Sequence, residues 1–427
     1  MIHSINEWLW GMPLILLLTG AGLFLTIRLK GIQFRSFYLC HKLAFSPHAD
    51  RAAGDISQFE AFSTSLASSI GIGSIAGVAV AVTDGGLGAL FWMWITALLG
   101  MPMKYSESYL ALKFREKDQS KEMCGGPMLY LERGLKAKWL ALAFAGFTIL
   151  SSLGIGNAVQ AHSIAETLES TFSFPPLYTG IGLSVLVGTA ILGGIKSIGR
   201  ITSILVPIMS VFFIGAAFII LILYSGQLPS AIGSIFQSAF TPKALFLAIM
   251  MGAAQGVFSS EAGLGVAGIA ASAAKASNPN EQSLIQMSTV SLTTLLVCTM
   301  TGLVLAVTGA TSSGLTGSKL ALEAFGMALP GGKLLLTIAI IPFGYSTILA
   351  WAYYAERSFD YLFGIRAIKP FRICFTLLIT VGATAQLQTV WDYAHLANGL
   401  MILPNLIGLI CLSGIVAKGL KTPKVPS

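Results

Sequence analysis

Glycine and hydroxyl residues interrupt two long apolar stretches of this chain at corresponding places. The first interruption reads Gly71-Ile-Gly-Ser74, and the second reads Ser259-Ser-Glu-Ala-Gly-Leu-Gly265. These residue types favour unwound backbone over helix, and unwinding frees N–H and C=O groups for a ligand. Inside a membrane, open backbone is tolerated only where it is buried in protein or lines a cavity. A matched pair of breaks therefore predicts a binding site near the middle of the bilayer.

The first break suits a ligand with both signs of charge. The start of the half-helix after the break offers N–H donors and a positive dipole end to an anion. Carbonyls at the end of the half-helix before it suit a small cation. A zwitterionic amino acid held by the freed backbone would fit both ends. The alternative is a simple kink with tight packing through small residues.

Glu261 lies in the second break, inside an apolar stretch. An acidic residue at such a position is costly and marks a functional site by default. It could cap the freed N–H groups, or it could carry a proton. We favour the structural role, because a break leaves N–H groups that need acceptors.

Another apolar segment carries Asn157, Gln160 and His162. Asn157 and Gln160 are three residues apart and share one helix face. These amides could contact a substrate or a gate, or they could join two helices by hydrogen bonds. His162 lies toward the outer end, where it is either a satisfied polar residue or a proton relay.

Ser346 and Thr347 supply hard oxygen atoms of the kind that Na⁺ binds together with backbone carbonyls. Trp351 follows Thr347 by one helical turn, so the two face the same way. A bulky indole there would restrict a pocket to small side chains, although Trp351 could instead anchor the helix at the membrane interface or fill the core. Lys104 and Glu107, three residues apart, are expected to form a structural ion pair.

The sequence does not favour an enzyme. Ser259, Ser260 and Glu261 have no visible base partner, and the chain has no phosphate-binding loop and no His/Cys cluster at metal-ligand spacing. The five cysteines form no close pair.

Membrane-spanning helices must position these residues. Hydrophobic residues make up 55% of the 427 residues, charged residues make up only 10%, and the mean hydropathy is +0.78. Soluble domains carry about 25% charged residues. Eleven apolar segments approach the length that crosses a bilayer. They are 8–29, 57–82, 86–112, 139–168, 177–194, 201–225, 243–272, 284–309, 333–358, 371–390 and 393–415.

Lys and Arg gather in every second loop between these segments, which predicts that those loops are cytoplasmic. The first basic loop includes Arg51, and the basic tail includes Lys421 and Lys424; the intervening loops hold only Lys243, Lys319 and Lys333. The N-terminus is then outside and the C-terminus inside. The net charge of +8 accordingly reports membrane orientation and gives no reason to expect a nucleic-acid partner. Segment 8–29 follows no positively charged region, so we favour a membrane helix over a signal peptide.

The two broken segments are the second and the seventh, five crossings apart. After an odd number of crossings the second copy inserts upside down, which is a known transporter plan. We therefore expect an extra N-terminal helix and basic loop (1–56), a first five-helix repeat (57–225), an outer connection (226–242), a second five-helix repeat (243–415) and a basic tail (416–427). This expectation rests on the position of the breaks, because the two halves share little sequence.

The chain resembles the alanine or glycine:cation symporter family over nearly its whole length. The motifs that carry the resemblance are Trp8-Leu-Trp-Gly-Met-Pro13, Gly73-Ser-Ile-Ala-Gly-Val-Ala79, Gly88-Ala-Leu-Phe-Trp-Met-Trp94, Gly125-Gly-Pro-Met-Leu-Tyr130, Gly193-Gly-Ile-Lys-Ser-Ile-Gly-Arg200, Ser260-Glu-Ala-Gly-Leu-Gly265, Ser346-Thr-Ile-Leu-Ala-Trp351 and Asn398-Gly-Leu-Met401. The resemblance implies an all-α, leucine-transporter-type fold with a 5+5 inverted repeat after one extra helix. It also implies import of alanine or glycine across a bacterial inner membrane by alternating access, coupled to Na⁺ or H⁺.

The resemblance also implies positions for the ligands. The substrate would lie against Ile72, Gly73, Ser74, Gln160, Phe258 and Trp351. A Na⁺ ion would lie between the carbonyls of Ala67 and Ile70 and the hydroxyls of Ser346 and Thr347.

The chain departs from the family pattern at three places. The usual Gly-Thr-Gly-Asn reads Gly71-Ile-Gly-Ser74, Ser260 replaces an Asn, and His162 stands where Asn is common. Recognition by backbone could survive these changes, whereas recognition by side chains would differ. The lost polar groups motivate a second hypothesis, an uncoupled amino-acid channel or a sensor on a transporter scaffold with a degenerate ion site.

Overall fold

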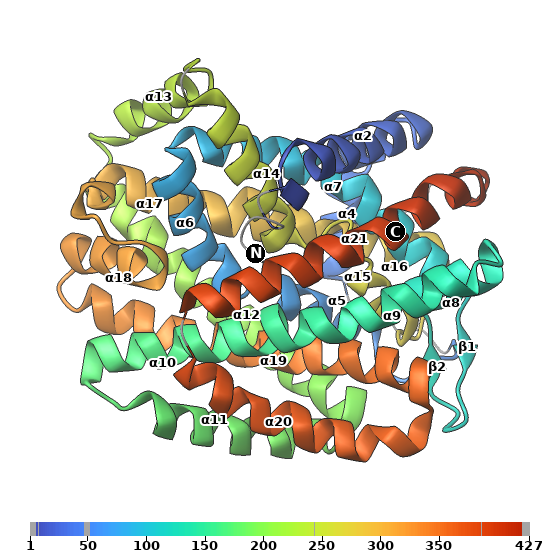
Figure 1. Cartoon of the computed structure of the whole chain (residues 1–427). Helices are drawn as coiled ribbons and strands as arrows, with labels where there is room; N and C mark the ends of the chain where they lie inside the picture. Colours follow the sequence, from blue (N-terminus) through green and yellow to red (C-terminus); the bar gives the residue numbers. More distant parts are fainter. Residues whose placement is uncertain (1–5, 7, 47–51, 243, 386, 421–427) are drawn as a thin grey trace.

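The computed structural model describes residues 6, 8–46, 52–242, 244–385 and 387–420. Four basic residues used in the orientation argument, Arg51, Lys243, Lys421 and Lys424, lie outside these ranges. Helices make up most of the described chain (Figure 1), which confirms the expected all-α membrane protein. A single antiparallel ladder within the described residues joins β1 (Glu116–Lys117) and β2 (Met123–Cys124).

Six helical stretches among the described residues are long and apolar enough to cross a membrane. They are α9–η3–α10 (Lys138–Leu153, Gly154–Ala158 and Val159–Phe172), α12 (Gly194–Leu223), α16–η4–α17 (Pro279–Val290, Ser291–Cys298 and Thr299–Thr308), α19 (Gly332–Phe363), η6–α20 (Ile365–Ala367 and Ile368–Thr384), and most of α21 (Leu387–Gly419). A seventh is the broken pair α5 (Gln58–Ser69) and η1–α6 (Ile72–Ser74 and Ala76–Gly85), bent by 58°.

Helices also occupy the remaining expected segments. These helices are α2 (Met12–Arg28), α7 (Gly88–Lys113), α11 (Pro176–Ile191), α14 (Leu245–Ser260) and α15 (Val266–Ser272). The connecting elements are α3 (Ile32–Arg35), α4 (Phe37–Ala44), α8 (Pro127–Leu129), η2 (Tyr130–Gly134), α13 (Leu228–Ala239), η5 (Ala310–Ser313) and α18 (Gly317–Ala328). By length and composition the described residues contain six or seven crossings, so the total of eleven, the inverted repeat and the five-part division of the chain stay predictions.

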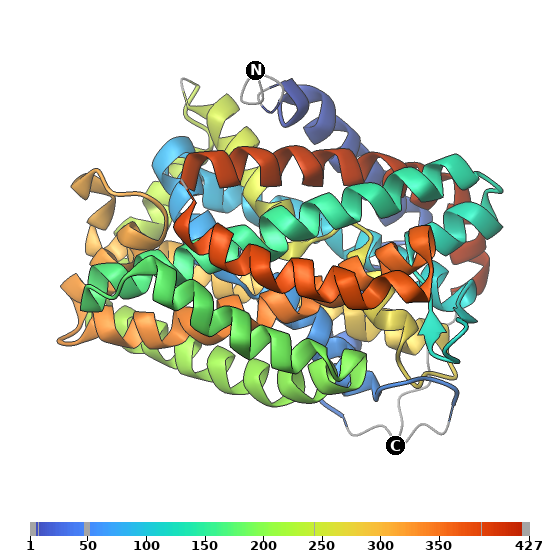
Figure 2. The same ribbon diagram turned by 60° about the horizontal axis from the view of Figure 1, so that its bottom comes forward.

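Large apolar side chains are exposed along the outer helices. Val185 of α11, Val211 of α12 and Leu377 of α20 are examples. In Figure 2 the green α11 and α12 lie along one edge of the bundle. Exposed apolar side chains along whole helices are expected where a protein faces the acyl chains of a bilayer.

The broken spans lie inside the bundle. A capping box starts α5: the Ser57 hydroxyl accepts from the Glu60 N–H at 3.1 Å, and the Glu60 carboxylate accepts from the Ser57 N–H at 2.8 Å. Every residue of 61–69 is buried, and α5 packs against α12, α19 and α15. α14 and α15 pack against α7. The unwound backbone of both breaks is therefore enclosed by protein, as a membrane interior demands.

Candidate functional site

The first break lies where the glycine pattern predicts it. α5 ends at Ser69, Gly71 is extended (φ −115°, ψ −162°), and the short helix η1 follows. A Cβ at Gly71 would overlap Oγ1 of Thr347 and would lie 3.3 Å from Oε1 of Gln160. The chain at the break therefore fits closely against α19 and α10, and only glycine leaves room for both neighbours.

Gln160 holds freed backbone at the first break. Its Oε1 accepts a hydrogen bond from the Ile72 N–H at 3.3 Å, and its Nε2 donates to the Ile155 carbonyl at 3.0 Å. The Ser74 hydroxyl donates to the Ser69 carbonyl at 3.2 Å. The structure thus brings Gln160 to the break, while its contact with a substrate stays a prediction.

The four expected Na⁺ ligands meet only in part. Oγ1 of Thr347 donates to the Ala67 carbonyl at 2.8 Å, so two hard oxygen atoms from α19 and α5 lie together. The Ser346 hydroxyl instead donates to the Phe343 carbonyl at 3.1 Å and lies 3.7 Å from Sδ of Met209 on α12. Thr347 and Ala67 fit an ion of the Na⁺ class, since both offer neutral oxygen donors. Ser346 would need another rotamer to join them.

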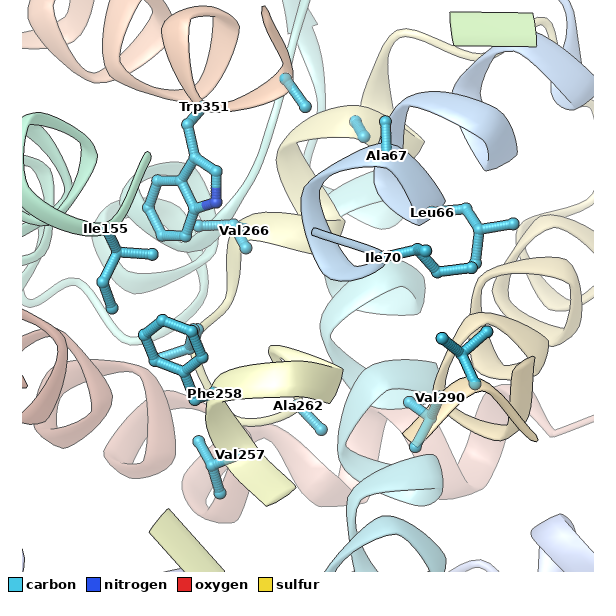
Figure 3. Packing of buried hydrophobic residues seen from close by; sticks show 14 of the residues in the cluster. Leu66, Ala67, Ile70, Ile155, Val257, Phe258, Ala262, Val266, Val290 and Trp351 are labelled. Atoms are coloured by element: carbon cyan, nitrogen blue, oxygen red, sulfur yellow. The ribbon is translucent and has the colours of Figure 1, made fainter. Parts of the chain in front are cut away.

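Two aromatic side chains expected at the substrate pack against glycine backbone. The Phe258 ring covers Gly73, and the Trp351 indole covers Gly156; a Cβ on either glycine would overlap the ring. Figure 3 shows Trp351 and Phe258 reaching the same interior region, beside Ile155. Trp351 is fully buried, so it is not an anchor at the membrane interface.

The second break also lies where it is predicted. α14 ends at Ser260, and Glu261 has a left-handed backbone conformation (φ 54°, ψ 18°). Gly263 and Gly265 also have positive φ values, 90° and 85°, before α15 begins. A non-glycine residue with positive φ is uncommon, and such a residue persists where its surroundings fix it.

The Glu261 carboxylate joins three helices. Its Oε2 accepts from the hydroxyls of Ser68 at 2.6 Å and Ser69 at 3.3 Å, and its Oε1 accepts from Nε1 of Trp351 at 2.9 Å. Nζ of Lys104 lies 3.9 Å from Oε2 and donates to the Ser260 carbonyl at 2.9 Å. Glu261 therefore links the second break to the end of α5, to α19 and to α7.

Sequence reasoning missed the roles of Lys104 and Glu107. They do not form the expected pair with each other; within the described residues, the ion pair of Lys104 is with Glu261. The freed Gly263 N–H donates to Oε1 of Glu107 at 2.8 Å, so this acid performs the capping that was expected of Glu261. Asn405 of α21 donates to the same oxygen at 3.0 Å. The sequence did contain a signal for these roles. Two charged residues lie in one apolar segment, and the second break frees backbone groups that need both a donor and an acceptor.

Asn157 and His162 have other surroundings. Asn157 donates to the Phe375 carbonyl of α20 at 2.8 Å, which favours its role in holding two helices together. Nδ1 of His162 is buried and has no hydrogen-bond partner among the described residues. A gating or proton role for either residue stays a prediction.

Backbone hydrogen bonds join the expected cytoplasmic ends of the two broken spans. The N–H of Asp55, before α5, donates to the Ala273 carbonyl at 2.8 Å, and the Lys275 N–H donates to the Ile56 carbonyl at 2.8 Å. Arg115 also donates to four carbonyls around this junction, those of Ala53, Ser272, Ala274 and Ala276, at 2.7–3.1 Å. The start of α5 and the end of α15 are therefore held against each other.

An ion-pair cluster lies beside this junction. Arg357, near the end of α19, contacts Asp118 at 2.8 Å and Glu122 at 3.3 Å in the β1–β2 hairpin. Loss of hydration raises the pKa of Glu122, although the Arg357 charge acts to lower it, and nearby carboxylates such as Asp118 raise it further. Burial also raises the pKa of the Cys124 thiol in the same hairpin to about 12.

Comparisons with known proteins agree over the full length. The model of the sodium:alanine symporter family matches residues 1–423. The chain is 47% identical over 435 residues to the sodium/alanine symporter AgcS of Methanococcus maripaludis, an alignment that covers 99% of this chain and 96% of the relative. It is 36% identical over 426 residues to a protein of Bacillus subtilis named probable sodium/glutamine symporter GlnT (97% and 88% covered). It is 32% identical over 426 residues to the amino-acid carrier protein AlsT of the same organism (98% and 90% covered).

Proposed function

This chain belongs to the sodium:alanine symporter family and is a Na⁺-coupled amino-acid transporter, and on that premise we propose that it imports alanine or glycine by alternating access. The observation that carries the proposal is the meeting of two contacts at the first break. Thr347 reaches the Ala67 carbonyl on one side, and Gln160 reaches the Ile72 N–H on the other.

We propose that the substrate carboxylate binds the freed N–H groups of Ile72, Gly73 and Ser74. The 3.3 Å bond from the Ile72 N–H to Gln160 is long, so a carboxylate can replace it with a shorter, charge-assisted bond. The helix dipole of α6 favours a negative charge at this end. Phe258 and Trp351 would then bound the substrate side chain and keep it small.

We propose that Na⁺ is held by Ala67, Ile70, Thr347 and, after a rotamer change, Ser346. The bound ion supplies a positive charge that neutral oxygens of α5 and α19 share. Those oxygens hold the end of α5 against α19, while the substrate holds the break against α10. Coupling requires only that both ligands prefer the same arrangement of α5, because each then raises the affinity for the other.

We also propose the remaining organisation from the loop charges and the two breaks. Two inverted five-helix repeats follow one extra helix, the N-terminus is outside and the C-terminus is cytoplasmic, and the membrane is a bacterial inner membrane. In this arrangement the joined ends of α5 and α15 close the cytoplasmic side.

The test is uptake of labelled alanine and glycine into proteoliposomes under an imposed Na⁺ gradient, a proton gradient or neither. Uptake that requires Na⁺ supports the proposal. Uptake driven by a proton gradient alone contradicts the proposal that Na⁺ is the coupling ion. Excess unlabelled glutamine tests a wider substrate range, since one relative is named for it. Counterflow separates a carrier from a channel, because only a carrier exchanges label against unlabelled substrate. An absence of both uptake and counterflow for alanine and glycine would overturn the proposed substrate.

A further inference from the structure

Three charged side chains form a buried cluster beside the second break. Lys104 and Glu107 of α7 have exposed fractions of 0%, and that of Glu261 is 2%. The Lys104 charge acts on both carboxylates. Two acids and one ammonium group would leave one net negative charge if all three were ionised. An uncompensated charge away from water is so unfavourable that such a group takes up a proton instead.

The surroundings of the cluster supply no second positive charge. Within the described residues, Lys104 is the one cation within 4 Å of Glu261, and none lies within that distance of Glu107. Among the residues that the structure describes, the titratable groups that face the cluster from other helices are two phenols. Tyr130 donates its hydroxyl hydrogen to Oδ1 of Asn405, and the Tyr354 hydroxyl lies 3.1 Å from that of Ser68. Phenols are neutral at ordinary pH, so they cannot balance the second carboxylate.

Hydrogen bonding distinguishes the two acids. Both oxygens of Glu261 receive donors: Oε2 has Ser68, Ser69 and the nearby ammonium, and Oε1 has the Trp351 indole. This environment stabilises a carboxylate.

Glu107 is different, because its two oxygens are unequal. Oε1 accepts from the Gly263 N–H at 2.8 Å and from Nδ2 of Asn405 at 3.0 Å. Oε2 is buried and has no hydrogen-bond partner among the described residues. This asymmetry fits a neutral carboxylic acid better than a carboxylate, with the carbonyl at Oε1 and the hydroxyl at Oε2, because a carboxylate would leave negative charge on an oxygen that no donor contacts.

We propose that Glu107 is a proton-binding site, with the proton on Oε2, and that this proton balances the charge of the buried Lys104–Glu261 pair. An unpaired neutral hydroxyl is far less costly to bury than an unpaired carboxylate. In neutral Glu107, Oε1 still accepts the hydrogen bond from the Gly263 N–H. The backbone of the second break therefore keeps its conformation while Glu107 is protonated. Loss of the proton places a second negative charge beside Glu261 and weakens the packing of the break against α7. The site does not depend on which amino acid the protein carries.

Infrared difference spectroscopy of the purified, full-length protein tests the proposal directly. At neutral pH the wild-type protein should show the carbonyl stretch of a buried protonated carboxylic acid, and that band should shift in deuterated water. Glu107→Gln should remove the band, whereas Glu122→Gln, outside the cluster, should keep it. Glu261→Gln should also weaken the band, because Glu107 is then the remaining carboxylate of the cluster and ionises to balance Lys104. The proposal is overturned by a band that persists in Glu107→Gln, or by a wild-type protein without the band. Whether the wild-type protein shows the band can be decided from its own spectrum, even if a variant does not fold.

Thermal unfolding against pH gives an independent readout that needs no transport. A group that is protonated when folded and ionised when unfolded stabilises the fold at lower pH, and this stabilisation is lost as pH rises through the folded-state pKa. The Tm of the wild type should therefore fall as pH rises from the ordinary Glu pKa of about 4.3 through the folded-state pKa of Glu107. Glu107→Gln carries a permanent neutral isostere and should show a smaller fall. Equal slopes for the two proteins contradict the proposal.

Discussion

The indole N–H of Trp351 donates to Oε1 of Glu261 over 2.9 Å. One residue is the proposed wall of the substrate pocket, on α19, and the other is the left-handed residue at the second break. The same carboxylate accepts from Ser68 at the end of α5. A displacement of the Trp351 indole therefore alters the hydrogen bonds of a carboxylate that both breaks share, and the proposed pocket wall is directly connected to both unwound segments.

Two variants of Trp351 distinguish its effect on pocket size from its hydrogen bond to Glu261. Trp351→Ala should admit larger neutral amino acids, shown by stronger competition of glutamine against labelled alanine. Removing a large buried aromatic side chain also costs about 3–5 kcal/mol of stability, so uptake must be normalised to folded protein. Trp351→Phe keeps one aromatic ring and removes the pyrrole part of the indole with its N–H donor; we expect it to keep more of the selectivity for small substrates than Trp351→Ala does, while losing transport rate. Unchanged competition in Trp351→Ala would remove this residue from the pocket.

Thr347 and Ser346 should differ in their effect on Na⁺. Thr347→Val keeps the side-chain shape and removes the oxygen that lies 2.8 Å from the Ala67 carbonyl. It should raise the Na⁺ concentration for half-maximal uptake about tenfold or more, which corresponds to about 1.4 kcal/mol. Ser346→Ala should have a smaller effect, because its hydroxyl bonds within α19 and faces Met209. A Na⁺ dependence unaltered by Thr347→Val would place the ion elsewhere.

These two neighbours also show how far the sequence could predict the site. Local composition located both breaks, because glycine and hydroxyl residues act on the backbone where they stand. Direction is not local: successive helix residues point about 100° apart, so Ser346 and Thr347 face different helices. The resemblance to the family placed both hydroxyls at one Na⁺ site, and only the packing of α19 between α5 and α12 decides which hydroxyl meets the break.

The partners of the second break could not be predicted for the same reason. The spacing of Lys104 and Glu107 allows a pair on one helix. In the structure, α7 packs against both α14 and α15, and the unwound backbone between them competes for the two side chains. Lys104 donates a hydrogen bond to the Ser260 carbonyl, and Glu107 accepts one from the Gly263 N–H. A helix spacing rule cannot include groups that are distant in sequence and become available only after the span unwinds.

Gly73 should be intolerant of even one added methyl group. A Cβ at this position would overlap the Phe258 ring, so Gly73→Ala must displace either the ring or the break. Overpacking of this kind costs about 1–3 kcal/mol, and uptake should fall with it. Gly146→Ala in α9 is the matched control, because a Cβ there meets nothing within 4 Å and alanine favours helix by about 1 kcal/mol. The Tm and the uptake rate of both variants are measured. Equal values for Gly73→Ala and Gly146→Ala would contradict the close contact between Gly73 and the Phe258 ring.

Glu122 should make the contact between the joined ends of α5 and α15 sensitive to pH. Its pKa is raised from the ordinary 4.5 while the hairpin packs beside Arg357, chiefly by loss of hydration. When the ends separate, the carboxyl regains water and its pKa returns toward the ordinary value. The closed arrangement therefore binds the proton more tightly. Acidification through the range between the raised and the ordinary value favours closure, and this contribution is lost as pH rises through the raised value.

Cys124 offers a native reporter for that prediction. It is 8% exposed and its thiol has a pKa of about 12, so alkylation requires the hairpin to open. Alkylation slows at low pH in any protein, because the thiolate is the reactive form, and Glu122→Gln provides the control for this effect. At higher pH the ionised Glu122 favours opening in the wild type, so the alkylation rate of Glu122→Gln should be the lower one. As pH falls, the ratio of the variant rate to the wild-type rate should rise toward one, because both side chains are then neutral. The rates are measured on the peptide that contains Cys124, because Cys374 and Cys411 are also free thiols, exposed at the surface of the bundle. A ratio that stays constant with pH would mean that the proton on Glu122 does not bias closure.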